Sequence, residues 1–153
     1  MLQDTNIDLL DQAIANLDPF YPDTNIKTWQ EHYRIPGDAP TVLERQLLLA
    51  MGDCNRKLAD WRAALEKAAT DAGNPIPTVL PIDNELDYEE AVFALAFGLL
   101  IPLLPSVVMD ERAREEIARL KLSPGPYFDR GDSRLGRIRG DSLGLGHMKA
   151  VVI

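Results

Sequence analysis

Four stretches of the chain place apolar side chains at helical spacing, and each predicts a helix. The first covers residues 5–17, where the apolar positions on one face are Leu9, Leu10, Ala13, Ile14 and Leu17. Pro19 ends this helix, because proline cannot continue one. A proline-rich connector over residues 18–40 follows. It is expected to contact the core through Trp29 and Tyr33, and it can contain either a short helix or an edge strand.

The longest helix is predicted over residues 41–72 and ends at Gly73. Its apolar residues form one stripe, with alternating steps of four and three: Leu47, Met51, Cys54, Leu58, Trp61, Leu65 and Ala68. The next helix, over residues 86–101, is apolar nearly all round from Ala91 onward, so other elements must surround it. Pro102 and Pro105 are expected to break it before a last helix over residues 107–122.

These elements predict an all-α fold, a helical bundle of about four helices over residues 1–122, followed by a long extended C-terminal arm over residues 123–153. The arm has six glycines and two prolines in 31 residues, a composition typical of chain that does not pack as a regular element. Arg-Gly-Asp-Ser occurs in it twice, beginning at Arg130 and at Arg139, and favours a tight turn.

The net charge of −8 is unevenly distributed. Residues 1–120 carry 21 acidic and 10 basic residues, a net of −11, whereas residues 121–153 carry 3 acidic and 6 basic residues, a net of +3. Phosphate binding needs clustered positive charge, so the acidic body argues against a protein that wraps nucleic acid. The acidic residues are densest before and within the start of the third helix, at Asp83, Glu85, Asp87, Glu89 and Glu90.

The arm alternates cations with apolar side chains, a pattern that a merely solubilising tail does not need. We therefore expect it to dock on an acidic, partly apolar partner and to order as it binds. The residues predicted to dock are Tyr127, Phe128, Arg130, Arg134, Leu135, Arg137, Ile138 and Arg139. The alternative for the same pattern is a disordered solubilising tail.

Residues for catalysis or for a bound cofactor are not apparent in the sequence. Cys54 lies on the apolar stripe of the longest helix and is expected to be a core residue. Neither His32 nor His147 has a neighbour at metal-ligand spacing, and the acidic cluster lacks the pattern of a calcium loop. We therefore predict no enzyme, no cofactor and no metal site. The apolar run over residues 91–105 is too short to span a bilayer, which needs about 20 apolar residues, so no membrane partner is expected.

The order of these elements resembles the head-to-tail connector (adaptor, or packaged-DNA stabilisation) proteins of tailed bacteriophages. The features that carry the resemblance are Trp61 in "LADWRAALEKAATDAG", the apolar helix "YEEAVFALAFGLLIPLLP", and the charged segment "VVMDERAREEIARL" after it. The resemblance covers about residues 5–122. The chain is similar too, more loosely, to the head-completion proteins of contractile-tailed phages.

The resemblance implies a structural virion protein at the head–tail interface, made in the host cytoplasm. Such adaptors form a homo-oligomeric ring, usually of twelve copies, below the portal protein. Their helical bundles surround a channel for DNA, their C-terminal arms reach along the portal, and tail (nozzle or tail-tube) proteins dock below. The acidic cluster is then expected to face the channel, where it would repel phosphate and let DNA pass without sequence-specific binding.

Two other classes of function remain open at this point. One is a small cytoplasmic regulatory module that binds an acidic partner through its basic arm. That reading predicts a monomer or dimer instead of a ring. The other is an enzyme that uses the acidic cluster, which lacks a combined base, nucleophile and orienting group.

Overall fold

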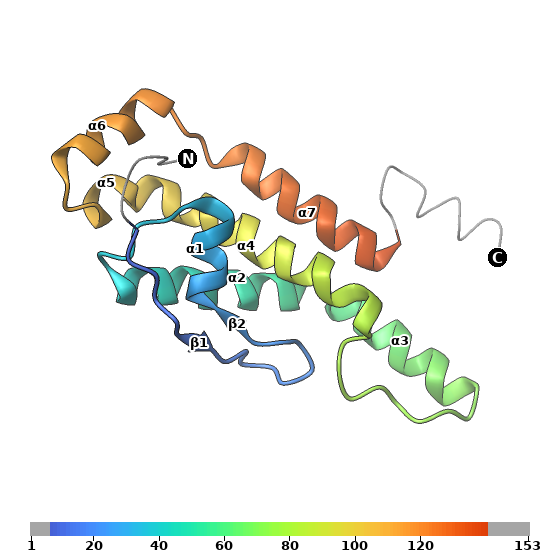
Figure 1. The fold of residues 1–153 in the computed structure, drawn as a ribbon. Coiled ribbons are helices and arrows are strands. Elements are labelled where there is room, and N and C mark those ends of the chain that lie inside the picture. Colours follow the sequence, from blue (N-terminus) through green and yellow to red (C-terminus); the bar gives the residue numbers. More distant parts are fainter. Residues whose placement is uncertain (1–6, 141–153) are drawn as a thin grey trace.

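The protein is a mostly helical, elongated structure built around one central helix (Figure 1). The structure is a computed structural model, and it describes residues 7–140. A short antiparallel strand pair joins β1 (Ala13–Ile14) to β2 (Thr24–Asn25). The helices are α1 (Ile26–Tyr33), α2 (Pro40–Lys57), α3 (Ala59–Asp71), α4 (Glu85–Leu100), α5 (Leu104–Val107), α6 (Glu111–Leu120) and α7 (Gly125–Arg139). The 3₁₀ turns η1 (Ile82–Asn84) and η2 (Ile101–Leu103) precede and follow α4.

The helix predicted over residues 5–17 is wrong for the part that the structure describes, because residues 7–17 are extended or form β1. Of its expected inward positions, Leu9 and Leu17 are exposed. Long-range hydrogen bonds hold the segment extended. The side chain of Gln30 on α1 accepts from Leu10 N at 2.8 Å and donates to Asp8 O at 2.7 Å, while Ile26 N donates to Gln12 O at 3.0 Å.

The connector contains both elements that the sequence left open. Thr24–Asn25 forms β2, and the side chain of Asn25 then caps α1 by accepting from Lys27 N at 2.9 Å. Trp29 and Tyr33 contact the core, as predicted. The Trp29 side chain is fully buried and donates to Phe93 O at 3.1 Å, and the Tyr33 ring stacks on Phe97 at 4.8 Å between ring centroids.

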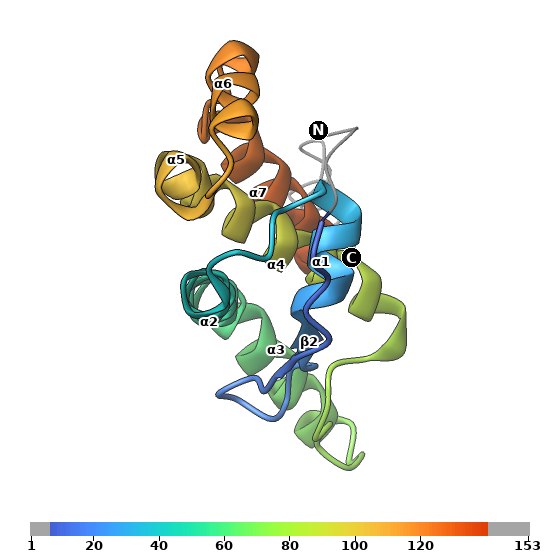
Figure 2. The same cartoon turned by 60° about the vertical axis from the view of Figure 1, so that its left-hand side comes forward.

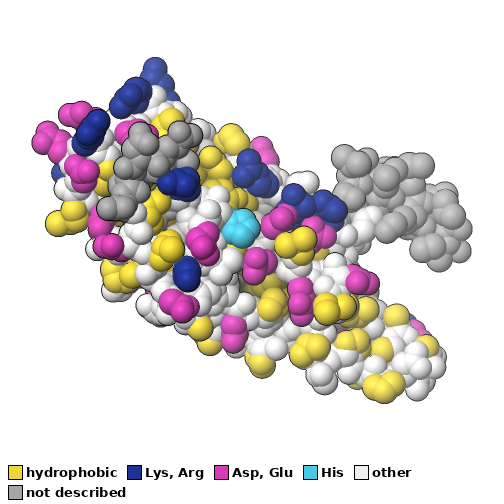
Figure 3. All heavy atoms as spheres, viewed as in Figure 1, with side chains coloured by type: hydrophobic (Ala, Val, Ile, Leu, Met, Phe, Trp, Pro, Cys, Tyr) yellow, Lys and Arg dark blue, Asp and Glu magenta, His cyan; other side chains and the backbone are white. Residues whose placement is uncertain are grey.

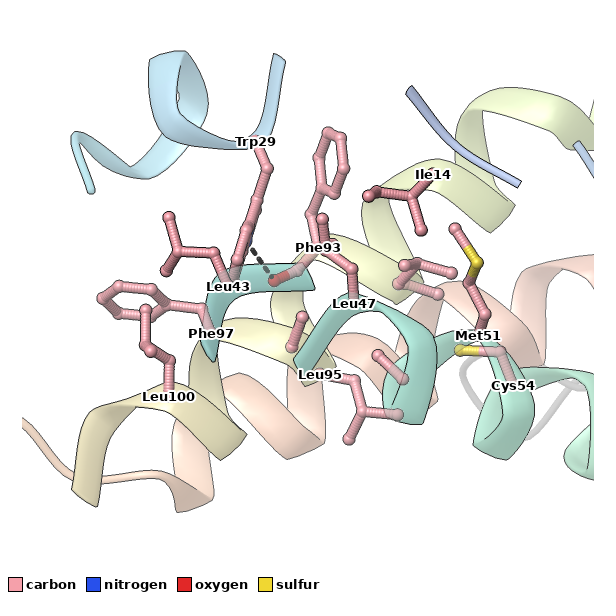
Figure 4. Packing of buried hydrophobic residues seen from close by; sticks show 14 of the residues in the cluster. Ile14, Trp29, Leu43, Leu47, Met51, Cys54, Phe93, Leu95, Phe97 and Leu100 are labelled. Carbon is pink, nitrogen blue, oxygen red and sulfur yellow. Dashed lines mark hydrogen bonds between the residues drawn. The ribbon is translucent and has the colours of Figure 1, made fainter. Parts of the chain in front are cut away.

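The longest predicted helix is divided at Leu58 into α2 and α3, and it ends at Gly73 in the left-handed region, as expected. The apolar stripe is confirmed along α2, where Leu47, Met51 and Cys54 are buried (Figure 4). Beyond Leu58 the stripe is only partly buried: Trp61 and Leu65 pack against the core, Ala68 is exposed, and α3 has no fully buried residue. Figure 1 shows α3 leaving the body of the molecule at the end where α7 finishes.

Helix α4 is the centre of the fold, as its all-round apolar sequence predicted. Figures 1 and 2 show α1, α2 and α7 arranged around it, and every residue from Ala91 to Gly98 is buried. The helical stretch from Ile82 to Val107 is long and apolar enough to cross a membrane by composition alone. Its most apolar window is 67% buried inside the protein, which identifies it as a core helix.

Helix α4 ends at Leu100, just before Pro102, as the sequence predicted, but the chain continues in short helical turns past both prolines. Each proline lies in the first turn of a new short element, Pro102 in η2 and Pro105 in α5. That is a position where proline removes no helical hydrogen bond. The chain leaves the helix only after Val107, and α6 begins later than expected, capped by Asp110, whose side chain accepts from Arg112 N at 3.0 Å.

The extended arm predicted over residues 123–153 is wrong for residues 125–139, which form helix α7 and pack along α4. Gly131, Leu135, Gly136 and Ile138 are the buried residues of α7. The first Arg-Gly-Asp-Ser is therefore helical and makes no turn. The second begins at the end of α7, where Gly140 has φ 81°. Its Asp141 and Ser142, with the rest of the predicted arm, lie outside the described residues.

Candidate partner-docking surface

Two glycines set how closely α7 approaches α4. A Cβ atom at Gly98 on α4 would lie 2.5 Å from the ring of Phe128, so the absence of a side chain makes room for that ring. A Cβ atom at Gly131 on α7 would lie 3.3 Å from Ala91 O and 3.7 Å from the Leu95 side chain. Small residues at such crossings let helix backbones come together. Gly131 is one of the glycines that led the sequence analysis to predict an extended arm here.

Charged side chains join α7 to its neighbours along the same face. The guanidinium of Arg134 lies 2.8 Å from Glu90 Oε2 and 3.5 Å from Asp87 Oδ1, and Arg137 Nε lies 3.6 Å from the same oxygen of Asp87. On the other side, Lys57 Nζ at the end of α2 is 2.8 Å from Asp132 Oδ1. Hydrogen bonding to Asp132 raises the pKa of Lys57, so its ammonium group stays charged at neutral pH.

We expect the Lys57–Asp132 pair to stabilise the fold only weakly, because both side chains are substantially exposed. Asp132→Asn should change the free energy of unfolding by less than about 1 kcal/mol, and the difference should shrink in high salt. Urea unfolding at low and high ionic strength measures this. A salt-independent loss of several kcal/mol would contradict it.

The residues predicted to dock on a partner are divided by the structure into an internal and an external set. Leu135 and Ile138 are buried in the core. Arg134 is half-buried in its ion pairs with α4, and Phe128 packs on Gly98. The side chains of Arg130, Arg137 and Arg139 are exposed, and Tyr127 is half-buried at the edge of the helix. Residues 127–139 therefore form a packed helix and do not display all eight predicted docking residues to a partner.

The acidic candidates are likewise divided. Asp87 and Glu90 hold the arginines of α7, so two of the residues predicted to face a channel form an internal contact with the predicted arm. Asp83 and Glu85 are exposed, and Glu89 is half-buried. Within residues 7–140, neither Asp83 nor Glu85 forms an ion pair, which leaves them available to a partner.

Three apolar side chains close to these two acids in the chain are exposed, in the loop before α4 and at its start. Val79, Ile82 and Leu86 are 62%, 79% and 64% exposed, respectively. We call the surface made by these three with Asp83 and Glu85 the 79–86 lobe. In Figure 3, apolar side chains gather over α3 and the loop that leads from it to α4. Exposed apolar patches of this kind mark interaction sites in soluble proteins.

A groove lies between α1 and α7, and we call it the α1–α7 groove. It consists of two adjoining hollows of about 280 and 390 Å³ that share His32, Tyr33 and Arg130. Phe97, Leu120, Leu122 and Tyr127 give the larger hollow an apolar lining. The guanidinium of Arg130 lies 5.2 Å from the centroid of the Tyr127 ring and 3.5 Å from Tyr33 Oη, so aromatic contacts position it at the rim.

Another hollow, of about 530 Å³, lies between the segment around Gly37 and helix α6. Carboxylates and arginines both line it, among them Asp38, Asp110, Arg112 and Arg119. Asp38 Oδ2 accepts from Met109 N at 3.3 Å and ties the two walls together. A mixed, open lining of this kind favours no particular ligand.

Sequence reasoning missed a buried polar network that joins three distant segments. Asn16 Nδ2 donates to Tyr88 Oη at 2.8 Å, Tyr88 Oη donates to Asn55 Oδ1 at 2.5 Å, and Asn55 Nδ2 donates to Asn16 Oδ1 at 2.9 Å. Burial raises the pKa of Tyr88, so its hydroxyl stays protonated and can donate. No spacing in the sequence links residues 16, 55 and 88. These groups fix the β1–β2 segment on the bundle and offer no reaction.

Cys54 is buried, and burial raises the pKa of its thiol to about 12. A thiol reagent at pH 8 should therefore label it at least tenfold more slowly in the folded protein than in urea, because the thiolate is the reactive form. Since the folded protein holds this proton to higher pH than the unfolded chain, the thiol contributes stability that is lost as pH rises from about 9 to 12. Equal labelling rates in both states would contradict this burial.

Groups of three or more metal-ligating side chains are absent from residues 7–140. The prediction for His147 lies outside the described residues. His32 is exposed and its Nδ1 lies 2.9 Å from Thr28 O within α1. The described surface therefore offers two candidate sites for a protein partner. One is the apolar, acidic lobe, and the other is an aromatic groove lined by three arginines and by the carboxylates Glu31 and Glu90.

Comparison with known proteins gives one match. The family model described as phage head completion protein (GPL) matches residues 14–124. No curated protein and no solved structure matches the chain. The matched region runs from β1 to the residue before α7, so it includes both the lobe and most of the groove.

Proposed function

Because the chain belongs to the phage head completion protein family, we propose that it acts as a head-to-tail connector, a ring below the portal that retains packaged DNA and joins head to tail. The family role is structural and lies in assembly of the phage head, which makes this a head-associated virion protein produced in the host cell. The observation that carries the proposal is the family match over residues 14–124. The more specific proposal, a ring below the portal, is supported by the negative charge of residues 1–120 and by the exposed arginines of α7.

The charge distribution supports a ring through which DNA passes. Residues 1–120 carry a net charge of −11, so a ring of such subunits would surround its channel with negative charge. Phosphates would be repelled from the wall, and DNA would move without adhering. Asp87 and Glu90 are neutralised by the α7 arginines, so this effect depends on the remaining acids of the body.

In this proposal the portal contact is made by the end of the predicted arm. Arg137 and Arg139 are exposed on α7, and the second Arg-Gly-Asp-Ser begins at that helix end. Residues 141–153, outside the described part, would extend the contact along the portal. When every subunit of a ring makes one weak contact of this kind, the contacts together bind much more tightly than one alone, by avidity. Tail proteins would dock on the opposite side of the ring.

The test is to mix the purified protein with purified portal rings and to measure the mass of the complex by light scattering. We expect many copies to join each portal ring in a defined number, and we expect deletion of residues 141–153 to prevent this while the circular dichroism spectrum keeps its helical signal. The regulatory-module alternative predicts a monomer or dimer that ignores portal rings. That result, with folded protein, would refute the connector.

A further inference from the structure

We propose that the 79–86 lobe of one copy binds in the α1–α7 groove of the next copy, and that this contact links subunits in the assembly. The inference rests on the proposed function, because it names the surfaces through which the proposed ring would form. It assigns Asp83 and Glu85 to a contact between copies, whereas the sequence alone suggested that they face the channel.

The first argument is that the two surfaces are complementary in shape and polarity. The lobe projects Ile82, 79% exposed, and Leu86, 64% exposed, from the start of α4. The larger hollow of the groove combines apolar groups with the charged Glu31 and Arg34, and Leu120 in its lining is 44% exposed. Burying large apolar side chains in a preformed hollow is the main source of affinity at protein interfaces.

The second argument is charge. Asp83 and Glu85 flank the apolar tip of the lobe, and neither forms an ion pair within the described chain. Arg130 at the rim of the groove also lacks a carboxylate partner there, being held by Tyr33 and Tyr127. Opposite charges at the edge of an apolar contact fix its register and suppress wrong pairings.

The third argument is that a single chain cannot satisfy both surfaces by itself. Leu86 of the lobe and Phe97, which lines the larger hollow of the groove, lie eleven residues apart on α4, about 16 Å along one rigid helix. The lobe of a copy therefore cannot enter its own larger hollow, and in this proposal a second copy supplies the lobe that does. One such contact for each subunit, repeated from copy to copy, joins every lobe to a groove. Contacts between unlike patches of this kind close into rings when the rotation permits.

Charge reversal tests the pairing. Arg130→Glu, and separately Asp83→Arg with Glu85→Arg, should each weaken association between copies by about tenfold or more, measured by light scattering across a concentration series and on portal rings. A chain that carries all three changes should associate again, because the charges are exchanged. Arg45→Glu is the control, since this exposed arginine lies on α2 outside the groove, and it should have no effect.

Cross-linking tests the position. Equal amounts of a Leu86→Cys copy and a Leu120→Cys copy should form a disulfide between copies under mild oxidation. Leu49→Cys, on α2 and 49% exposed, replaces Leu120→Cys in the control mixture, which should give no more than random product. The natural Cys54 is fully buried and does not compete.

Cross-links no more frequent than in the control, or charge-reversed chains that associate like the wild type, would overturn the contact. The contact would also be overturned if association were lost in the Arg130→Glu variant and in the Asp83→Arg, Glu85→Arg variant but did not return in the chain that carries all three changes. A protein that cross-links as expected but ignores portal rings would uphold the contact and refute the connector function. If charge-reversed variants no longer cross-linked but still joined portal rings, the connector function would be upheld. The proposal that this contact links subunits in the assembly would then be overturned.

Discussion

Trp29→Ala is expected to lower the free energy of unfolding by about 3–5 kcal/mol, a large fraction of the roughly 5–15 kcal/mol that stabilises a typical domain. The Trp29 side chain is fully buried between α1 and α4, in contact with the core that Figure 4 shows. Its removal leaves a cavity and also leaves Phe93 O without its hydrogen bond from the indole, which is 3.1 Å long. Urea unfolding followed by circular dichroism measures the change.

The chain offers a matched control in its other tryptophan. Trp61 lies on α3, a helix with no buried residue, and is only half-buried. Trp61→Ala removes the same atoms but leaves no comparable cavity, so it should cost about 1 kcal/mol or less. Similar losses at both positions would contradict the structure, because they would place α3 in the core.

Gly98→Ala is expected to destabilise the protein by about 1–3 kcal/mol, although alanine is the better helix former. The added methyl group would lie 2.5 Å from the Phe128 ring, so α7 must move away from α4 or Phe128 must leave its site. The same substitution at Gly52, where the nearest atom is the end of the Arg56 side chain at 3.6 Å, should instead stabilise α2 slightly. Thermal unfolding of both variants gives the comparison.

A second substitution identifies Phe128 as the cause. Phe128→Ala alone should destabilise the protein by removing the ring, but Gly98→Ala added to it should then cost little or stabilise, because the clash is gone. The pair should therefore show a coupling energy of about 1–3 kcal/mol. Additive effects of the two changes would show that α7 does not pack on α4 through this contact.

Some features of the protein follow from the sequence alone. Helix α4 had to lie at the centre, because a helix that is apolar on every side cannot leave any side in water. The stripe on α2 had to face it, and Gly73 marked the end of α3 because an αL position favours glycine. The family resemblance also came from this order of helices, and the match over residues 14–124 agrees at the level of phage head completion.

The tertiary structure decided the elements whose local signals were weak or misleading. Residues 9–17 have apolar side chains at helical spacing, yet hydrogen bonds to Gln30 and Ile26 hold the segment in a non-helical conformation. These partners are distant in the sequence, so a local pattern cannot predict them. In α7, apolar groups at Phe128, Leu135 and Ile138 have helical spacing, but the glycines among them suggested an arm. One of those glycines, Gly131, lies against Ala91 and Leu95 of α4 and allows the close packing of the two helices.

Contacts between segments that are distant in the sequence also explain why the structure divides the predicted docking and channel-facing residues. The sequence determined which residues carry charge and apolar surface, but not which of them neutralise one another. Arg134 meets Glu90 only because α7 runs back along α4. Each charge therefore has a partner within the chain, although both side chains still line the smaller hollow of the groove. Lobe and groove arise in the same way, since the packing of α1, α4 and α7 decides which apolar side chains remain exposed.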